Sequence, residues 1–194
     1  MFILTTIQDL VQIAPQDFEK DSAEAIEDNI NQKYSNKAIQ KIGLCICMYD
    51  LLSASEGLIG HGTGMVNVNV EFRMVVFRPF KGEIIMGKIA SATPKGIKIS
   101  LDFFEDIVVP PRLLFENCHF NVQEQCWVWS AEGGSELYFD NNIVVRFRVE
   151  AEHWNDQSPA APSEAAYNSE IQKQSPYMIE ASMSQSGLGP IEWW

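Results

Sequence analysis

The chain has 194 residues, of which 46% are hydrophobic and 21% charged, so it can bury the core of one large domain or two small ones. Its formal net charge of −12 argues against a general nucleic-acid binder, which normally carries a basic surplus. No run approaches the ~20 consecutive apolar residues of a membrane span, and the first residues lack the basic flank and cleavage site of a secretory signal.

The charge is unevenly distributed. Residues 1–78 carry 6 basic and 10 acidic side chains (net −4), residues 79–150 carry 7 and 10 (net −3), and residues 151–194 carry 1 and 6 (net −5). The middle of the chain is therefore the least unfavourable part for RNA. The four cysteines show no paired framework, which indicates a reducing compartment, nuclear or cytosolic.

The N-terminal part predicts a sheet with one helix. Residues 1–13 have the composition of a strand, and Pro15 ends it. Asp21 followed by Glu24 is typical of a helix start. The expected apolar stripe of this helix consists of Ala23, Ile26, Ile30 and Tyr34.

Two longer strands follow the helix. Residues 41–52 are apolar at successive positions and predict a central strand covered on both faces. After a Gly- and Ser-rich turn, apolar residues alternate strictly with polar ones from Val66 to Val76, which predicts a long half-buried strand. Pro79 and Gly82 then break the pattern, and we place a domain boundary between residues 1–79 and 80–187.

The second half consists of short strands and turns. Strands are expected at residues 83–92, 97–101, 103–109 and 143–149, with a hairpin whose arms WVW and ELYF flank residues 131–135. Residues 155–175 have few large apolar side chains and are expected to be disordered. A last strand should follow at 177–183, because its loss would leave unpaired barrel edges; the alternative is a tail after Trp154. The pattern favours an all-β, five-stranded OB barrel followed by a tail at 188–194.

Several of these runs resemble the larger stalk subunit of archaeal and eukaryotic RNA polymerases. They are MFILTTIQDLVQIAP, AIEDNINQKYSNK, EGLIGHGTG and, most specifically, VEFRMVVFRPFKGEI at the predicted boundary. The runs GIKISLDFFEDIVVPPRLL, WVW…ELYFD and SGLGPIEWW are most similar to the polymerase III form. The resemblance covers essentially the whole chain apart from the low-complexity segment.

The resemblance implies an α+β, RNP-like tip domain that docks on the polymerase core and an OB barrel near the exit path of nascent RNA. It also implies a heterodimer with a smaller helical stalk subunit, contacts with initiation factors and a nuclear location. Neither a cofactor nor an active site of its own is expected. The alternative is a free-standing OB-fold RNA-binding factor in translation or RNA processing.

Three sets of residues are the candidates for these contacts. Glycines with short polar neighbours allow close approach of another chain, and the resemblance favours core docking over an ordinary helix end and loop. This set is Lys33, Tyr34, Asn36, Lys37, Ile59, Gly60, His61 and Gly62. Apolar residues at the boundary and on the first strand could bind the smaller partner or seal the contact between the domains. They are Leu10, Val11, Val75, Phe77 and Phe80.

For RNA, basic and aromatic side chains on barrel strands are the candidates, against the alternative of a solvated strand face. They are Lys88, Lys98, Phe103, Arg112, Arg146 and Arg148, with the last two expected to form the best pair. Because Ile97, not an aromatic residue, follows Gly96, binding should be weak and sequence-tolerant. The closing Trp193 and Trp194 are expected to dock on the barrel or on a neighbouring subunit.

Metal and catalytic sites are not predicted. Cys118, His119 and Cys126 lack zinc-ligand spacing, and Cys45 and Cys47 are expected to share a buried strand face. The three histidines have no partners arranged for acid–base or nucleophilic chemistry. The GHGTG run at residues 60–64 is followed by no P-loop Lys-Ser/Thr pair.

Overall fold

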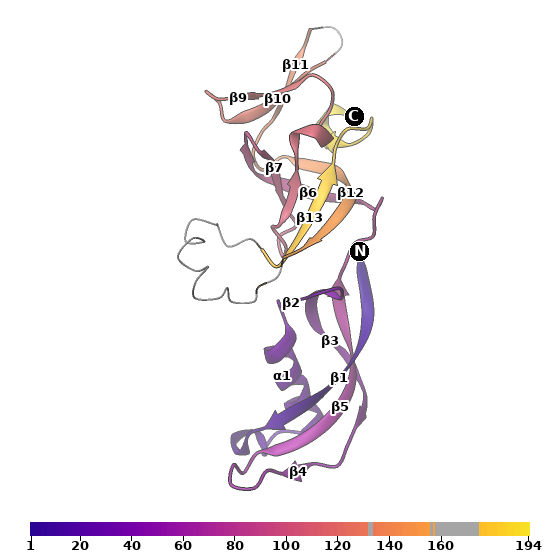
Figure 1. Cartoon of the computed structure of the whole chain (residues 1–194), viewed down its shortest axis with the longest axis vertical. Coiled ribbons are helices and arrows are strands. Elements are labelled where there is room, and N and C mark those ends of the chain that lie inside the picture. The colour runs from indigo at the N-terminus through magenta and orange to yellow at the C-terminus, as the bar shows by residue number, and fades with distance from the viewer. Residues whose placement is uncertain (132–133, 156, 158–174) are drawn as a thin grey trace, which may run out of the picture. The chain divides into compact units, whose positions relative to one another are not determined.

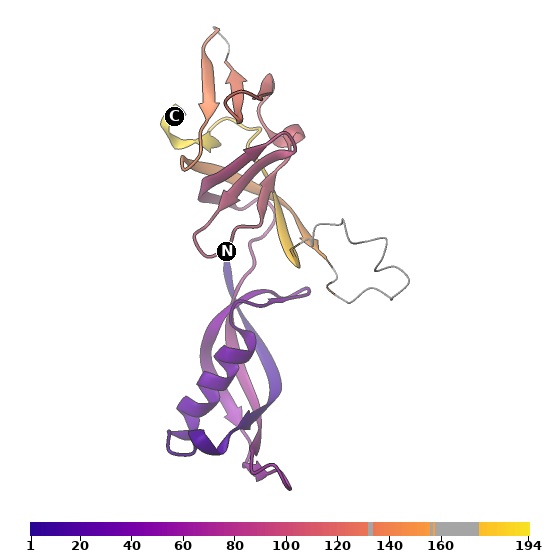
Figure 2. The same ribbon diagram turned by 90° about the vertical axis from the view of Figure 1, so that its left-hand side faces the viewer.

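The computed structural model describes residues 1–131, 134–155, 157 and 175–194. It divides into two compact units, Met1–Arg78 and Pro79–Trp194 (Figures 1 and 2). Almost all of the segment expected to be disordered, and two residues of the expected hairpin turn, lie outside the described residues.

The first unit is an antiparallel sheet with a helix on one face (Figure 2). The sheet order is β1-β5-β3-β2, and β4 pairs with β5. β5 is central because its strict alternation lets it bury one face under the helix while both edges pair. The elements are β1 (Phe2–Ile13), η1 (Pro15–Asp17), α1 (Ser22–Tyr34), β2 (Ala38–Ile39), β3 (Gly43–Ala54), β4 (Leu58–Ile59) and β5 (Val66–Phe77).

The helix begins where its cap predicts. The Asp21 carboxylate accepts a hydrogen bond from the Ala23 amide at 2.9 Å, which satisfies a backbone donor that has no partner within the helix. The buried face holds Ala25, Ile26 and Ile30; Ala23 is exposed, so the predicted stripe was wrong at its first position. No helix in the described part of the chain combines the length and apolarity of a membrane crossing.

The prediction that β3 is covered on both faces was wrong. α1, the one α-helix among the described residues, packs on a single face of the sheet, and Tyr49 on β3 is 60% exposed. The pairing with β5 shifts register between Cys45 and Cys47, because a bulge adds one residue to β3. Cys45 is therefore buried and Cys47 exposed, so the two do not share a face.

The second unit is built on a closed five-stranded barrel. The strand order is β13-β8-β7-β6-β12-β14, and an additional β12–β13 pairing closes the ring. The antiparallel sheet with one helix followed by an OB-type barrel confirms the predicted fold class. The barrel elements are β6 (Ile84–Thr93), β7 (Gly96–Ser100), β8 (Ile107–Val109), β12 (Val144–Trp154), β13 (Tyr177–Ser182) and β14 (Gly189–Pro190).

A second, three-stranded sheet lies between β8 and β12 in the chain, with order β11-β10-β9. The predicted hairpin forms, but it belongs to this sheet and not to the barrel. Trp127 joins the two, because its indole N–H donates to the Thr93 carbonyl at 2.9 Å. Its strands are β9 (Cys118–Asn121), β10 (Cys126–Ser130) and β11 (Glu136–Phe139). The second unit also contains two short 3-10 helices, η2 (Pro111–Leu113) and η3 (Ile191–Trp193).

The strand expected at 103–109 is shorter than predicted. Asp102 adopts a φ of 63°, and the Phe103 amide donates to the Leu101 carbonyl at 2.7 Å. This turn redirects the chain before β8, so regular pairing begins only at Ile107.

Candidate interaction surfaces

The predicted core-docking residues do not form one cluster. The Asn36 amide donates to the Cys45 carbonyl at 2.9 Å, and Cys45 pairs with Val76. Ile59 instead pairs with Val66, at the other end of β5. Ten residue positions separate Val66 from Val76, or about 33 Å along a strand. Asn36 and Ile59 therefore lie near opposite ends of β5, and the structure does not bring the helix end and the turn at Ile59 together.

The β4 turn, residues 58–64, is the more exposed of the two groups. Leu58 and Ile59 are 70% and 74% exposed. The Gly60 amide donates to the Met65 carbonyl at 2.7 Å, which closes the turn and holds the two apolar side chains at its end. His61 and Gly62 follow on the exposed side of the same turn. An apolar, exposed turn of this kind is suited to insertion into a pocket of another chain.

Lys33 and Tyr34 tie the helix to β1. The Lys33 ammonium forms an ion pair with the Asp9 carboxylate, and the Tyr34 hydroxyl donates to the same group at 2.8 Å. Partial burial alone would raise the pKa of Asp9, but the hydrogen bonds from Lys33 and Tyr34 outweigh it and lower the pKa. Burial, together with Asp9, raises the pKa of Tyr34 to about 12. These two side chains are therefore engaged within the first unit.

This contact predicts a pH dependence. A carboxylate whose pKa is lowered on folding contributes stability above its unfolded pKa of about 3.9, and that contribution is lost as the pH falls through the lower folded value. Asp9→Asn should therefore lower the free energy of unfolding of the first unit by about 1 kcal/mol near neutral pH, and by much less near pH 3. Amide hydrogen exchange of β1 and β5 would measure this difference in the full chain.

A matched control is available on the same unit. Asp28 pairs with Lys20 at 2.8 Å on the exposed side of α1, so Asp28→Asn should leave the exchange of β1 nearly unchanged. Equal exchange of wild type and Asp9→Asn near neutral pH would contradict the role given to Asp9.

Two of the predicted partner-binding residues are core residues. Val11 is 4% exposed beneath α1, and Phe77 is fully buried with its ring 5.7 Å from that of Phe2. Neither can offer surface to a partner, because Val11 packs in the core under α1 and Phe77 is buried on the opposite face of the sheet. Leu10 and Phe80 remain, at 45% and 64% exposed, with Val75 half-buried.

The sequence reasoning missed the start of β1. Phe2, Ile3 and Leu4 are consecutive and 47%, 41% and 47% exposed. Three successive apolar residues in a strand must place at least one side chain on each face, a signal that could have identified them. β1 is also an edge strand, because β5 is the only strand among the described residues that pairs with it. The first positions of β1 therefore combine apolar surface with a place at the edge of the sheet.

The face of the sheet opposite α1 is mainly polar. Arg73 donates through Nε to Asp50 at 2.8 Å, and its guanidinium lies 5.3 Å from the centre of the Tyr49 ring. Farther along the sheet, a shallow groove of about 630 Å³ is bordered by Gln8, Leu10, Ser53, Ser55, Asn69 and Glu71. This face offers hydrogen-bonding groups in its middle and apolar ones at the start of β1.

The predicted RNA-binding residues are spread around the barrel and are mostly neutralised. Lys88 lies 3.7 Å from Asp102 and Lys98 lies 3.6 Å from Asp106. Arg112 pairs with Glu180 and Arg148 with Glu150, whereas Arg146 is exposed and forms no ion pair with the described residues. Phe103, 44% exposed, follows Asp102 in the turn before β8. The structure therefore does not bring the six residues together on one face.

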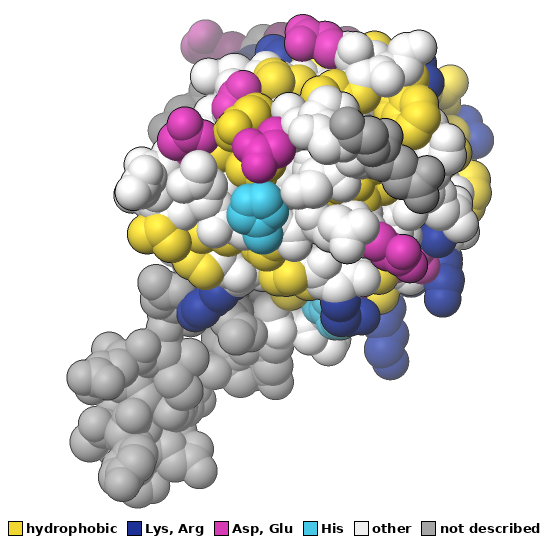
Figure 3. Space-filling model, turned by 90° about the horizontal axis from the view of Figure 1, so that it is seen from above, with side chains coloured by type: hydrophobic (Ala, Val, Ile, Leu, Met, Phe, Trp, Pro, Cys, Tyr) yellow, Lys and Arg dark blue, Asp and Glu magenta, His cyan; other side chains and the backbone are white. Residues whose placement is uncertain are grey.

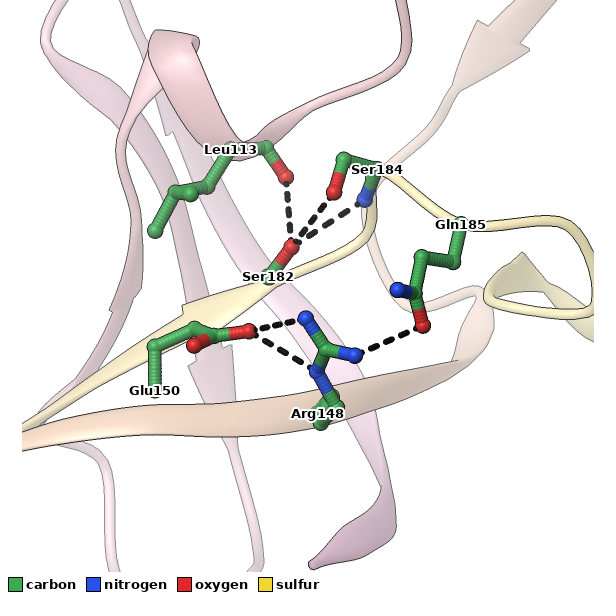
Figure 4. A network of polar contacts seen from close by, with 6 residues as sticks. All are labelled: Leu113, Arg148, Glu150, Ser182, Ser184 and Gln185. Atoms are coloured by element: carbon green, nitrogen blue, oxygen red, sulfur yellow. Dashed lines mark hydrogen bonds and ion pairs between the residues drawn. The ribbon is translucent and has the colours of Figure 1, made fainter. Parts of the chain in front are cut away.

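Arg148 belongs to an internal network of hydrogen bonds. It is therefore not a second unpaired cation beside Arg146, as the sequence predicted. Its Nε donates to Glu150 at 2.8 Å and its Nη1 to Gln185 at 2.7 Å (Figure 4). In the same network the buried Ser182 hydroxyl donates to the Leu113 carbonyl at 3.3 Å and lies 2.9 Å from the Ser184 hydroxyl. Together these bonds fix the residues after β13 against β12 and η2.

The final tryptophans pack on the β9–β11 sheet and on Phe115. The Trp193 ring lies 5.5 Å from Trp129 at 24° and 4.7 Å from Phe139 at 65°. Phe115 stacks on the same Trp129 at 4.7 Å. Trp194 is 56% exposed, and its indole N–H donates to the Leu188 carbonyl at 2.8 Å. The expected docking therefore occurs within the chain: the Trp193 ring packs on the small sheet, and η3 also lies beside β12 of the barrel.

This end of the second unit is not a cationic surface. Figure 3 shows apolar and acidic side chains intermixed over the face, with Lys and Arg side chains at its margin. The cysteines nearby are also not arranged as a reactive or metal site: burial raises the pKa of the Cys118 thiol to about 11. Within the described ranges, no three His, Cys, Asp or Glu side chains are grouped to hold a metal ion.

Comparison with known proteins agrees with this two-unit organisation. Residues 83–194 match the family described as "RNA polymerase III subunit Rpc25", and residues 8–64 match the "SHS2 domain found in N terminus of Rpb7p/Rpc25p". The DNA-directed RNA polymerase III subunit rpc8 of Schizosaccharomyces pombe is 43% identical over 100% of both chains. RPC8 of Bos taurus is 41% identical over 100% of this chain and 98% of its own. The RNA polymerase II subunit RPB7 of Saccharomyces cerevisiae is 25% identical over 77% of this chain.

Proposed function

The chain belongs to the RNA polymerase III subunit Rpc25 family, and on that premise we propose that it is the larger stalk subunit of DNA-directed RNA polymerase III. The main support is that the two units match the two parts of a polymerase subunit. The matches are consecutive and cover nearly the whole chain. A free-standing OB-fold factor would account for the barrel but not for the N-terminal match. The subunit is non-catalytic and works in the nucleus, as part of the polymerase.

A smaller helical subunit pairs with this chain through the start of β1. Exposed Phe2, Ile3 and Leu4 supply the apolar area that a heterodimer buries, at the edge of the sheet. Leu10 continues the same strand toward the polar groove.

The β4 turn docks on the core enzyme. Leu58 and Ile59 project from a closed turn and act as the apolar anchors of this contact. The barrel is then left for initiation factors and for nascent RNA. RNA contact is weak and sequence-tolerant, because four of the five candidate cations already have a carboxylate neighbour.

Affinity purification of the tagged chain from its own cells, followed by mass spectrometry, tests the proposal. The large subunits of RNA polymerase III should co-purify in stoichiometric amounts. Recovery with ribosomal proteins instead, or as a lone monomer, would reject the proposed function.

Ile59→Asp should separate the two contacts. A carboxylate on a buried anchor costs desolvation that the pocket cannot offset, so core subunits should be recovered at least about tenfold less well. The smaller partner should still co-purify, since it binds at the start of β1. Leu4→Asp is the reciprocal control and should lose the smaller partner first. Full core recovery with Ile59→Asp would remove the docking role of the turn.

A further inference from the structure

One face of the barrel combines exposed apolar side chains with cations. β6 and β12 lie side by side in antiparallel register (Figure 1), with Ile84 opposite Arg148, Met86 opposite Arg146 and Lys88 opposite Val144. We call these six residues the β6–β12 patch. Ile84, Met86 and Val144 are 61%, 58% and 39% exposed, although the alternate positions of both strands are buried in the barrel.

One cation of the patch has no counterion among the described residues. Arg148 is held by Glu150 and Gln185, and Lys88 has a loose contact of 3.7 Å with Asp102, a side chain that is 89% exposed. Arg146, exposed between Met86 and Val144, has no ion pair with any described residue. In a chain of net charge −12, a free guanidinium between apolar side chains is unusual.

The side chains of the β6–β12 patch limit the kinds of molecule that can bind to it. RNA binding on an OB barrel relies on aromatic platforms, and the patch holds no aromatic side chain. Strand addition is also excluded here, because β6 pairs with β7 and β12 while the first half of β12 pairs with β6 and β14. A second copy of this chain is disfavoured by its own large negative charge. An occupant must therefore bind through its side chains, with apolar groups and carboxylates in alternation.

We propose that the β6–β12 patch binds an acidic amphipathic helix of another protein. Residues 84 to 88 span about 13 Å of strand, which matches the ~11 Å between positions i and i+7 of a helix. Leu or Phe side chains of the helix cover Ile84, Met86 and Val144. Its carboxylates pair with Arg146, bidentately, and with Lys88. The apolar contacts exclude water around these charges, which strengthens them relative to a solvated ion pair.

Fluorescence anisotropy with the full chain and a labelled synthetic peptide tests the proposal. The probe has about four helical turns, with Leu at i, i+4 and i+7 spacing and Glu between. Arg146→Glu should weaken binding about tenfold and Met86→Ser about fivefold. Arg146→Lys keeps the charge but loses the bidentate geometry, so its affinity should lie between those of wild type and Arg146→Glu. Lys95→Glu and Val122→Ser change the same kinds of side chain outside the patch and should alter binding less than about twofold.

Three results would overturn the proposal. The first is equal peptide affinity for wild type and Arg146→Glu, with all variants showing the same tryptophan-fluorescence unfolding midpoint. The second is tighter binding of an oligouridine probe than of the peptide, abolished by Arg146→Glu, which would make the patch an RNA site. The third is a concentration-dependent dimer that Met86→Ser dissolves, which would make the occupant a second copy.

Discussion

Trp193→Ala should lower the free energy of unfolding of the second unit by about 2–4 kcal/mol, because a half-buried indole is removed from an aromatic cluster. Trp193 lies against Trp129, Phe139 and Phe115, so its loss exposes three rings at once. Tryptophan fluorescence measures this unit alone, since all five tryptophans of the chain lie beyond residue 126. Urea denaturation followed by this signal gives the difference in free energy.

Trp194→Ala is the control for the same cluster. Trp194 is 56% exposed and its main polar contact is one hydrogen bond to Leu188, so the expected loss is about 1 kcal/mol. Equal losses for the two variants would show that Trp193 has no special packing role. An unchanged midpoint for Trp193→Ala would contradict the docking of this segment.

Gly96→Ala should strongly destabilise the barrel, by about 3 kcal/mol or more. Gly96 has a φ of 142°, which L-residues rarely adopt, and an added Cβ would lie 2.4 Å from the Val109 carbonyl oxygen. Neither atom can move without opening the pairing of Ile97 with Val109. The same fluorescence-detected urea titration measures the loss.

Gly82→Ala is the control that separates the cost of backbone strain from the cost of a steric clash of the added Cβ. Gly82 also has a positive φ, 90°, but an added Cβ would have nothing within 4 Å, so only the backbone strain of about 1 kcal/mol is expected. A loss at Gly96 no larger than that at Gly82 would mean that β7 and β8 separate easily.

Regular periodicity was the part of the fold that the sequence predicted well. The alternation from Val66 to Val76 places β5, the Asp21 cap places the start of α1, and the need to close a barrel places β13. Each signal is local or follows from a general rule on unpaired edges. The errors in β3 arise because its pairing with β5 shifts register at three places between Cys45 and Ser53, which no periodicity in that apolar run reveals.

The candidate sites were less predictable because their partners are distant in sequence. Arg112 is neutralised by Glu180, and Arg148 is bound by Gln185, in contacts that depend on the folded barrel. Lys33 faces Asp9 from another element, and the helix end and β4 turn are separated by the length of β5. Residue type alone could select cations and glycines as candidates, but it could not show which side chains contact them in the folded chain.

The parallel pairing of β8 with β13 has a consequence for synthesis. Ile107 can pair with Ile179 only after Ser182 has left the ribosome, whereas every strand of the first unit is complete once Phe77 has emerged. Because domains fold as units in the order of their synthesis, the nascent protein should pass through a stage with a finished first unit and an open barrel. During that stage the unpaired edges of β8 and β12 are candidates for capture by a chaperone.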